Sequence, residues 1–157
     1  MRALLGLGAN IGDPVATLNE AKSRLARFGA VTAASALYRT PPWGVIEQPP
    51  FVNAAVALET ELDPDALLAA LKSLERELGR VASERWGPRA LDVDILDIDG
   101  VRRDNPDLTI PHARLYERAF ALVPLAEIEP SYAAARDALP AADLAAVERI
   151  GTFESER

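Results

Sequence analysis

Two aspartates near the middle of the chain have a spacing that could do chemistry. Asp92 and Asp94 alternate with aliphatic residues in Leu91-Asp92-Val93-Asp94-Ile95-Leu96. Successive side chains of an extended chain point to opposite faces, so a strand here would place both carboxylates on one face. Neighbouring carboxylates repel each other unless something positive lies between them. Mg²⁺, which prefers oxygen ligands, is the usual solution, and the spacing therefore indicates a metal site.

An arginine precedes this pair by three residues. Gly87-Pro88 predicts a turn that would deliver Arg89 beside the two carboxylates. A guanidinium offers two parallel donors to phosphate oxygens. Metal-binding carboxylates beside an arginine indicate chemistry on a nucleotide polyphosphate. If the two aspartates stood alone in the sequence, a solvated strand face would be the favoured interpretation. The compact run from Arg85 to Leu96 instead favours metal and polyphosphate binding.

Three other patterns carry less chemistry. The glycines between Gly6 and Gly12 approximate a dinucleotide-binding fingerprint, but the third is one position late and no acidic residue follows at the expected distance. We therefore favour a strand-to-helix turn. Neither lysine of the chain follows a glycine in a P-loop context, so a nucleotide must be held without a P-loop lysine. A second pair, Asp97 and Asp99, runs into Gly100 and indicates hairpin-turn chemistry.

The run from Arg85 to Leu96 resembles the signature of the 6-hydroxymethyl-7,8-dihydropterin pyrophosphokinases, a family of folate biosynthesis. That signature has Gly-Pro-Arg after a basic residue, then two alternating aspartates and two aliphatic residues, and the run fits it throughout. The resemblance covers roughly residues 4 to 130. The other segments that carry it are Leu7 to Asp13, Tyr38 to Gly44, Phe51 to Val56, and Thr109 to His112 with Arg118 and Phe120.

The resemblance implies a reaction and a set of catalytic residues. The diphosphate of ATP would be transferred to the hydroxymethyl oxygen of 6-hydroxymethyl-7,8-dihydropterin, giving AMP and the pterin diphosphate. Two Mg²⁺ ions would be held by Asp92 and Asp94, and the loops at 40–50 and 79–90 would close as lids. The catalytic residues would be Arg80, Arg89, Asp92 and Asp94. The ATP-binding residues would be Lys72, Glu75, Ile95, Thr109, His112 and Arg118.

The same resemblance implies a pocket for the pterin. A flat bicyclic pterin suits stacking between aromatic faces, and an asparagine side chain matches its amide-like edge. Ordinary packing is the alternative for the aromatics. From pattern alone, a solvated helix face is favoured for Lys72 and Glu75, and a surface or capping role for His112, the only histidine. The pterin pocket would consist of Thr40, Pro41, Trp43, Phe51, Asn53, Trp86 and Phe120.

The chain also departs from the family. No second arginine follows Arg80 within Val81-Ala82-Ser83, and Asp107 and Ala113 stand where a family member has arginine and tyrosine. Two other classes of function stay open: a non-catalytic ferredoxin-like nucleotide-binding module, and another Mg²⁺-dependent phosphoryl or nucleotidyl transferase. The residues that could substitute for the missing contacts are Arg76, Arg103 and Arg114.

Composition bounds the class of protein. The 157 residues suit one domain, residues 1–157, with a sizeable core. A net charge of −7 disfavours nucleic acid and anionic membranes as partners, so any anion site must be a local arginine cluster. The absence of cysteine excludes disulfides and is compatible with a cytoplasmic location. No apolar run approaches the length of a membrane-spanning helix. As partners we expect only the small molecules ATP and the pterin, and we expect the protein to be a monomer.

The elements that position these residues follow from hydrophobic periodicity and capping signals. Apolar runs predict strands at 3–7, 31–38, 51–58 and 91–98, and an extended piece at 108–111. Asp-Pro pairs, at Asp13 and Asp63, begin helices that end near Gly29 and Gly79. Further helices are expected at 114–127, broken near Arg118, and at 141–150. Strand-helix-strand, repeated, predicts an α+β fold of the ferredoxin-like kind, an antiparallel sheet with helices packed on it.

Overall fold

The computed structural model describes residues 1–41, 49–79 and 90–154. A six-stranded antiparallel sheet has the order β5-β1-β4-β3-β8, with β2 also pairing with β4, and a small second sheet joins β6 and β7. The elements, in chain order, are β1 (Arg2–Ala9), α1 (Pro14–Arg24), the 3-10 turn η1 (Leu25–Arg27), β2 (Ala30–Ala34), β3 (Ala36–Thr40), β4 (Phe51–Glu59), α2 (Pro64–Gly79), β5 (Asp92–Ile98), β6 (Arg103–Asp104), β7 (Thr109–Ile110), η2 (Leu115–Glu117), α3 (Ala119–Ile128), η3 (Pro130–Tyr132), α4 (Ala133–Asp137), α5 (Ala141–Ala145) and β8 (Glu148–Thr152).

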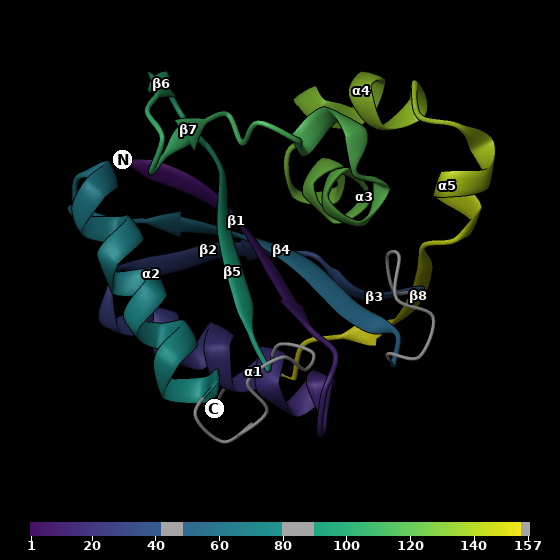
Figure 1. Cartoon of the computed structure of the whole chain (residues 1–157), viewed down its shortest axis with the longest axis horizontal. Coiled ribbons are helices and arrows are strands. Elements are labelled where there is room, and N and C mark those ends of the chain that lie inside the picture. Colours follow the sequence, from purple (N-terminus) through teal and green to yellow (C-terminus); the bar gives the residue numbers. More distant parts are fainter. Residues whose placement is uncertain (42–48, 80–89, 155–157) are drawn as a thin grey trace.

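The sheet separates two layers of helices. Figure 1 shows α1 and α2 on one side of the sheet and α3 and α4 on the other. Each face of the sheet has its own hydrophobic core, and successive side chains of β1 point into one or the other. Leu5 packs in the core beneath α1 and α2, whereas Leu4 packs in the core beneath α3. The order β1-α1-β2/β3-β4-α2-β5, with β1 and β4 at the centre, is the predicted ferredoxin-like α+β arrangement, which the structure confirms.

Both predicted helix starts are confirmed by their capping bonds. Asp13 Oδ1 accepts a hydrogen bond from the Ala16 amide at 3.1 Å, and Asp63 Oδ1 accepts one from the Ala66 amide at 2.8 Å. The predicted break before α3 is also present. Arg118 has extended backbone angles, φ −114° and ψ 103°, between η2 and α3.

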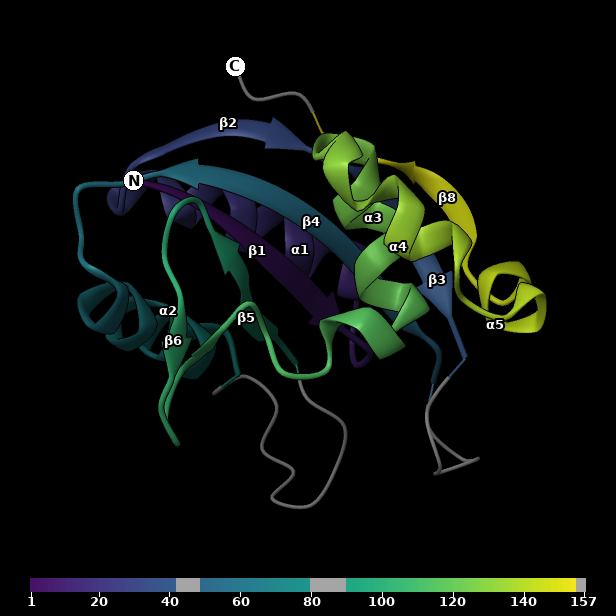
Figure 2. The same ribbon diagram turned by 90° about the horizontal axis from the view of Figure 1, so that it is seen from above.

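Three local predictions are wrong. The predicted strand 31–38 is two strands, β2 and β3, which are separated at Ser35, where the Ala55 amide donates to the Ser35 hydroxyl at 2.9 Å instead of to a backbone carbonyl. The predicted helix 141–150 ends at Ala145, and β8 follows as an edge strand beside β3 (Figure 2). The Asp99-Gly100 turn exists, but it makes no hairpin, since β6 pairs with β7 and not with β5.

Tertiary pairing explains the strand at the C-terminal end. The alanines before this strand favour helix, but intrinsic propensity is a small term that tertiary contacts readily override. β3 offers an open edge, and β8 pairs along it from Ala36 to Arg39. Arg39 and Glu148 add an exposed ion pair at 2.8 Å across the two strands.

Candidate active site

A β-bulge in β5 decides which aspartates reach which side of the sheet. In the pairing with β1, Leu5 is opposite Ile95 but Leu4 is opposite Asp97, so Leu96 is an extra residue. Ile95 belongs to the core beneath α1 and α2, whereas Leu96 belongs to the core beneath α3. The bulge therefore lets Asp97 share the α3 side of the sheet instead of entering the core with Ile95.

Asp92 and Asp94 lie opposite glycines. Their partners in β1 are Gly8 and Gly6, respectively. A Cβ atom on Gly8 would lie 2.8 Å from Asn53 Oδ1, and one on Gly6 would lie 3.3 Å from the Leu96 side chain. The absence of side chains at these two positions leaves room above β1 for the carboxylates and for Asn53.

The space above these glycines is a cavity of about 450 Å³. Eight of the side chains predicted for the site line it: Thr40, Phe51, Asn53, Asp92, Asp94, His112, Arg118 and Phe120. They come from β3, β4, β5, the segment after β7 and the start of α3. Residues up to 80 positions apart in the sequence thus face one space, as the resemblance implied.

One wall of the cavity is formed by β3 and β4. Asn53 is buried, and its Nδ2 donates a hydrogen bond to Thr40 Oγ1 at 3.0 Å. Thr40 lies opposite Phe51 in the pairing of the two strands. The Asn53–Thr40 bond fixes the orientation of the amide, while Phe51 adds an aromatic face to the same wall. This wall can recognise a flat ligand with donors and acceptors along one edge.

The opposite wall is cationic. The His112 amide donates to the Leu96 carbonyl at 2.8 Å, which ties the segment after β7 to the bulge of β5. His112 Nδ1 accepts from the Arg114 amide at 3.2 Å, so the neutral ring carries its proton on Nε2. Nε2 can then donate to a phosphate oxygen. The Arg118 guanidinium lies 5.5 Å from the centroid of the Phe120 ring, a cation–π distance.

The two arginines of this wall, Arg114 and Arg118, point at the cavity without a direct ion pair in the described part of the chain. The cavity also receives the N-terminal turn of α3, through Phe120 and Ala121. Amide groups at a helix N-terminus carry partial positive charge and favour anions. This wall is suited to a phosphate group.

Five predicted residues do not line the cavity. Ile95 packs in the core beneath α1 and α2, and Thr109 Oγ1 donates to the Asn105 carbonyl at 3.3 Å. Pro41, Lys72 and Glu75 are also absent from the lining. The predictions for Trp43, Arg80, Trp86 and Arg89, and for most of both lid loops, fall on residues outside the described part of the chain.

The solvated helix face favoured by pattern for Glu75 is wrong. Only 9% of this residue is exposed. Glu75 Oε2 accepts a hydrogen bond from the Val93 amide at 2.7 Å, and Oε1 lies 3.2 Å from Lys72 Nζ. Helical periodicity could not show this contact, because Glu75 faces the edge of β5 and lies outside the leucine stripe of α2.

Sequence reasoning missed one ionisable residue of the cavity and left another undecided. Glu117 lines the cavity from η2, within the segment where a helix broken near Arg118 was expected. Of the three arginines considered as substitutes, Arg114 lines the cavity, whereas Arg103 forms an ion pair with Asp65 at 2.9 Å. Arg76 is absent from the lining.

The residues present fit a hard divalent cation. Among the described residues, no group of three or more histidines, cysteines or carboxylates could hold a metal ion by itself. Mg²⁺, however, is usually held by one or two carboxylates, with substrate phosphates and water completing its shell. Asp92 and Asp94 face a cavity that has glycines beneath it and a phosphate-compatible wall opposite, which meets this requirement.

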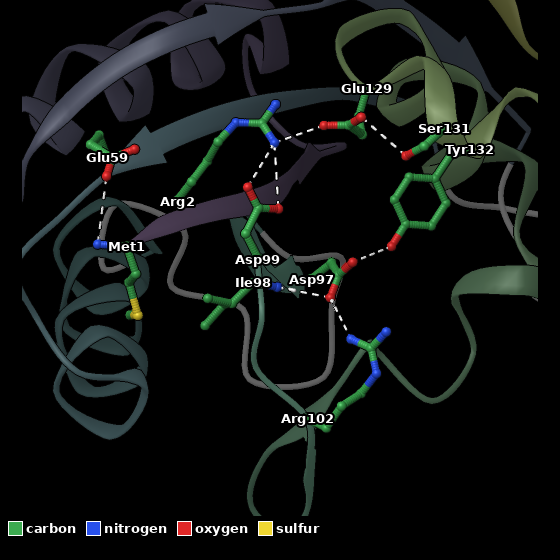
Figure 3. A network of polar contacts seen from close by, with 10 residues as sticks. All are labelled: Met1, Arg2, Glu59, Asp97, Ile98, Asp99, Arg102, Glu129, Ser131 and Tyr132. Carbon is green, nitrogen blue, oxygen red and sulfur yellow. Dashed lines mark hydrogen bonds and ion pairs between the residues drawn. The ribbon is translucent and has the colours of Figure 1, made fainter.

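The second aspartate pair, Asp97 in β5 and Asp99 in the turn after it, has protein partners. The Tyr132 hydroxyl donates to Asp97 Oδ2, and Arg102 lies 3.8 Å from Asp97 Oδ1 (Figure 3). Arg2 donates to Asp99 at 3.2 Å and to Glu129 at 2.7 Å. Burial, followed by the bond to Asp97, raises the pKa of Tyr132 well above its ordinary value. These contacts tie β1 and β5 to the segment after α3.

Comparisons with known proteins point to one family. A family model described as 7,8-dihydro-6-hydroxymethylpterin-pyrophosphokinase (HPPK) matches residues 4–130. A 2-amino-4-hydroxy-6-hydroxymethyldihydropteridine pyrophosphokinase from Methylorubrum extorquens is 48% identical over 155 residues, which cover 95% of this chain and 98% of that protein. A protein of the same name from Bacillus subtilis is 44% identical over 128 residues, covering 80% and 77%.

The fold also matches a solved structure. A Plasmodium falciparum HPPK-DHPS crystal structure superimposes with a TM-score of 0.69 at 16% sequence identity. The match covers 87% of this chain and 45% of that one, so this chain spans less than half of the solved chain. The likeness supports the fold.

No helix in the described ranges is long and apolar enough to cross a membrane.

Proposed function

The chain belongs to the 7,8-dihydro-6-hydroxymethylpterin-pyrophosphokinase family, and from this premise we infer its reaction. The enzyme transfers diphosphate from ATP to 6-hydroxymethyl-7,8-dihydropterin, giving AMP and the pterin diphosphate for folate biosynthesis. The observation that carries the assignment to this site is the convergence of an aspartate pair, an asparagine-aromatic wall and a cationic wall on one cavity. The roles of individual residues below are our proposal.

The proposed pterin subsite is the wall formed by β3 and β4. Asn53 would hydrogen-bond the amide-like edge of the pterin, with its orientation held by Thr40. Phe51 and Phe120, which both line the cavity, would contact the two faces of the ring. This binding would aim the hydroxymethyl group at the aspartate side of the cavity.

The proposed phosphate subsite is the cationic wall. Arg118 and His112, with Arg114 as an additional donor, would bind the diphosphate group and neutralise charge that shifts during its transfer. The transfer forms a bond between the hydroxymethyl oxygen and the β-phosphorus. It breaks the bond between that phosphorus and the oxygen bridging to the α-phosphate, so AMP leaves.

Asp92 and Asp94 would hold the metal, and we propose two Mg²⁺ ions. Metal ions held by these two carboxylates would supply positive charge to the phosphate oxygens and to the attacking hydroxyl group. The contribution of the chain is to hold both carboxylates on one strand face, opposite glycines that leave the space open. Lys72, Glu75, Ile95 and Thr109 as ATP contacts, and Arg80 and Arg89 as catalytic residues, stay predictions from the resemblance.

Three broader statements are also proposals. We propose that residues 1–157 act as a single domain, because one sheet organises both hydrophobic cores. We propose a monomer, because the cavity is built from residues of one chain. The lack of cysteine supports a cytoplasmic location.

One assay tests the proposed function. The protein is incubated with ATP, Mg²⁺ and 6-hydroxymethyl-7,8-dihydropterin, and the products are identified by mass spectrometry. We expect AMP and the pterin diphosphate in equal amounts, and neither product from Asp94→Ala. ADP as the nucleotide product would indicate a different phosphoryl transferase, and the absence of product with intact ATP binding would indicate a binding module.

A further inference from the structure

β5 lies at one edge of the main sheet, and among the described strands of that sheet it pairs with β1 alone. Val93, the residue between Asp92 and Asp94, donates its amide hydrogen to Glu75 Oε2 at 2.7 Å. This bond comes from α2, which runs beside β5 (Figure 1). A side chain of the helix thus supplies the acceptor that a neighbouring strand would otherwise provide.

The Glu75–Val93 hydrogen bond holds the backbone midway between the two aspartates. The Val93 side chain is buried in the core, 1% exposed, and its neighbours on both sides carry the two carboxylates that face the cavity. β1 holds the inner edge of this segment through the pairing of Leu7 with Val93. Glu75 holds the outer edge, so the backbone between the two aspartates is fixed from both sides.

Glu75 is itself well placed for this task. It is buried, and its two carboxylate oxygens have different partners: Oε2 accepts from Val93, and Oε1 pairs with Lys72 at 3.2 Å. A hydrogen bond from a backbone amide to a charged carboxylate is stronger than one to a neutral acceptor. Burial protects the bond from competition with water.

We propose that Glu75 is a positioning residue for the metal pair: by anchoring the Val93 amide, it fixes the relative orientation of Asp92 and Asp94. The proposal rests on the assignment of these aspartates as metal ligands under the proposed function. It differs from a direct contact of Glu75 with ATP, because it places the effect of Glu75 on the metal and leaves metal-free nucleotide binding unchanged.

Four variants separate these roles. Glu75→Met keeps the approximate volume but removes the acceptor. Glu75→Asp keeps the charge but withdraws the oxygens by one methylene. Glu75→Gln keeps an oxygen that can accept from the Val93 amide. Glu77→Met is the matched control, because Glu77 lies on the same helix but its carboxylate pairs with Arg24 of α1 and Arg27 of η1.

The main readout is Mn²⁺ affinity of the full chain, measured from the free-ion signal in electron paramagnetic resonance. We expect Glu75→Met and Glu75→Asp to raise the Mn²⁺ Kd by about 10-fold or more, the scale for residues that orient metal ligands. Glu75→Gln should restore most of the affinity, and Glu77→Met should leave it unchanged. Hydrogen exchange of the Val93 amide should accelerate in the Met and Asp variants.

A second readout excludes direct nucleotide contact. Metal-free α,β-methylene-ATP should bind the Glu75 variants with the Kd of the parent protein, measured by calorimetry. An unchanged Mn²⁺ Kd in both Glu75→Met and Glu75→Asp, or an equal loss of metal-free nucleotide binding, would overturn the positioning role. If Asp92→Asn also left the Mn²⁺ Kd unchanged, the failure would lie in the proposed metal assignment and not in Glu75 alone.

Discussion

The two ends of β5 carry the same pair of residue types in different surroundings. Asp92 and Asp94 face a cavity, lie opposite two glycines and have arginines without carboxylate partners on the opposite wall. Asp97 and Asp99 are engaged by a tyrosine and two arginines of the protein itself. The contacts of Asp97 and Asp99 join strands and helices of the fold, whereas Asp92 and Asp94 line the cavity in which a ligand can bind. The comparison predicts that substitutions at the two ends affect different properties.

Removing either cavity aspartate should have the largest effect. Asp92→Ala and Asp94→Ala are each expected to lower kcat by at least about 10²-fold, because a preorganised group that acts on the transferring phosphate is lost. The melting temperature should not fall, since removing one charge relieves repulsion in the metal-free protein. Steady-state AMP formation and thermal unfolding measure the two quantities. A large drop in melting temperature would make these aspartates structural.

The pterin wall offers a smaller and more selective effect. Asn53→Ala should weaken pterin binding by about 1–3 kcal/mol, the cost of leaving a buried polar partner unsatisfied, while MgATP affinity stays nearly constant. Calorimetric titration with each ligand measures both. Asn19→Ala, which removes an asparagine from α1 away from the cavity, is the control. Equal losses for pterin and MgATP would mean that Asn53 acts on the fold.

The far end of β5 should report on stability. Tyr132→Phe leaves Asp97 without its hydroxyl donor and should lower the free energy of unfolding by about 1–2 kcal/mol, with kcat little changed. Urea denaturation followed by circular dichroism checks this. Arg102→Ala removes an exposed partner of the same carboxylate and should cost less. A kcat loss in Tyr132→Phe comparable to that of Asp92→Ala would merge the two ends into one functional unit.

The smallest expected effect concerns pH. A hydrogen bond from Arg2 holds the pKa of Glu129 below its ordinary value of 4.5. The resulting stabilisation is fully present above pH 4.5 and is lost as the pH falls through the lower pKa of the folded state. Glu129→Gln should therefore cost about 1 kcal/mol or less near pH 7 and progressively nothing in acid. Unfolding free energies from pH 2 to 7 would show whether the difference between parent and variant shrinks in acid.

Much of the fold could be predicted because local signals agreed with tertiary contacts. The Asp-Pro caps, the leucine stripe of α2 and the alternation along β4 each specify an element and its buried face. The alternation of Asp92 and Asp94 likewise predicted a shared face. Their convergence with His112 and Arg118 could not follow from spacing, because it depends on the crossover from β5 to α3, and it came from the resemblance.

The errors fall where long-range contacts override a local pattern. The bulge at Leu96 changes the side of the sheet to which every later residue in β5 points, and no residue type in the strand indicates a bulge. β8 forms because β3 offers an open edge, although the alanines before it favour helix. Helical periodicity predicts a surface position for Glu75, yet its carboxylate accepts a hydrogen bond from the Val93 amide at the edge of β5.

The most direct test of the comparison is AMP release by Asp94→Ala and Asp97→Ala, measured side by side. Both proteins are assayed with saturating ATP, Mg²⁺ and pterin, at a temperature where circular dichroism shows each to be folded. We expect Asp94→Ala to lose at least about 10²-fold in kcat and Asp97→Ala to stay within about one order of magnitude of the parent. Equal losses in the two variants would contradict the division of β5 into a catalytic end and a structural end.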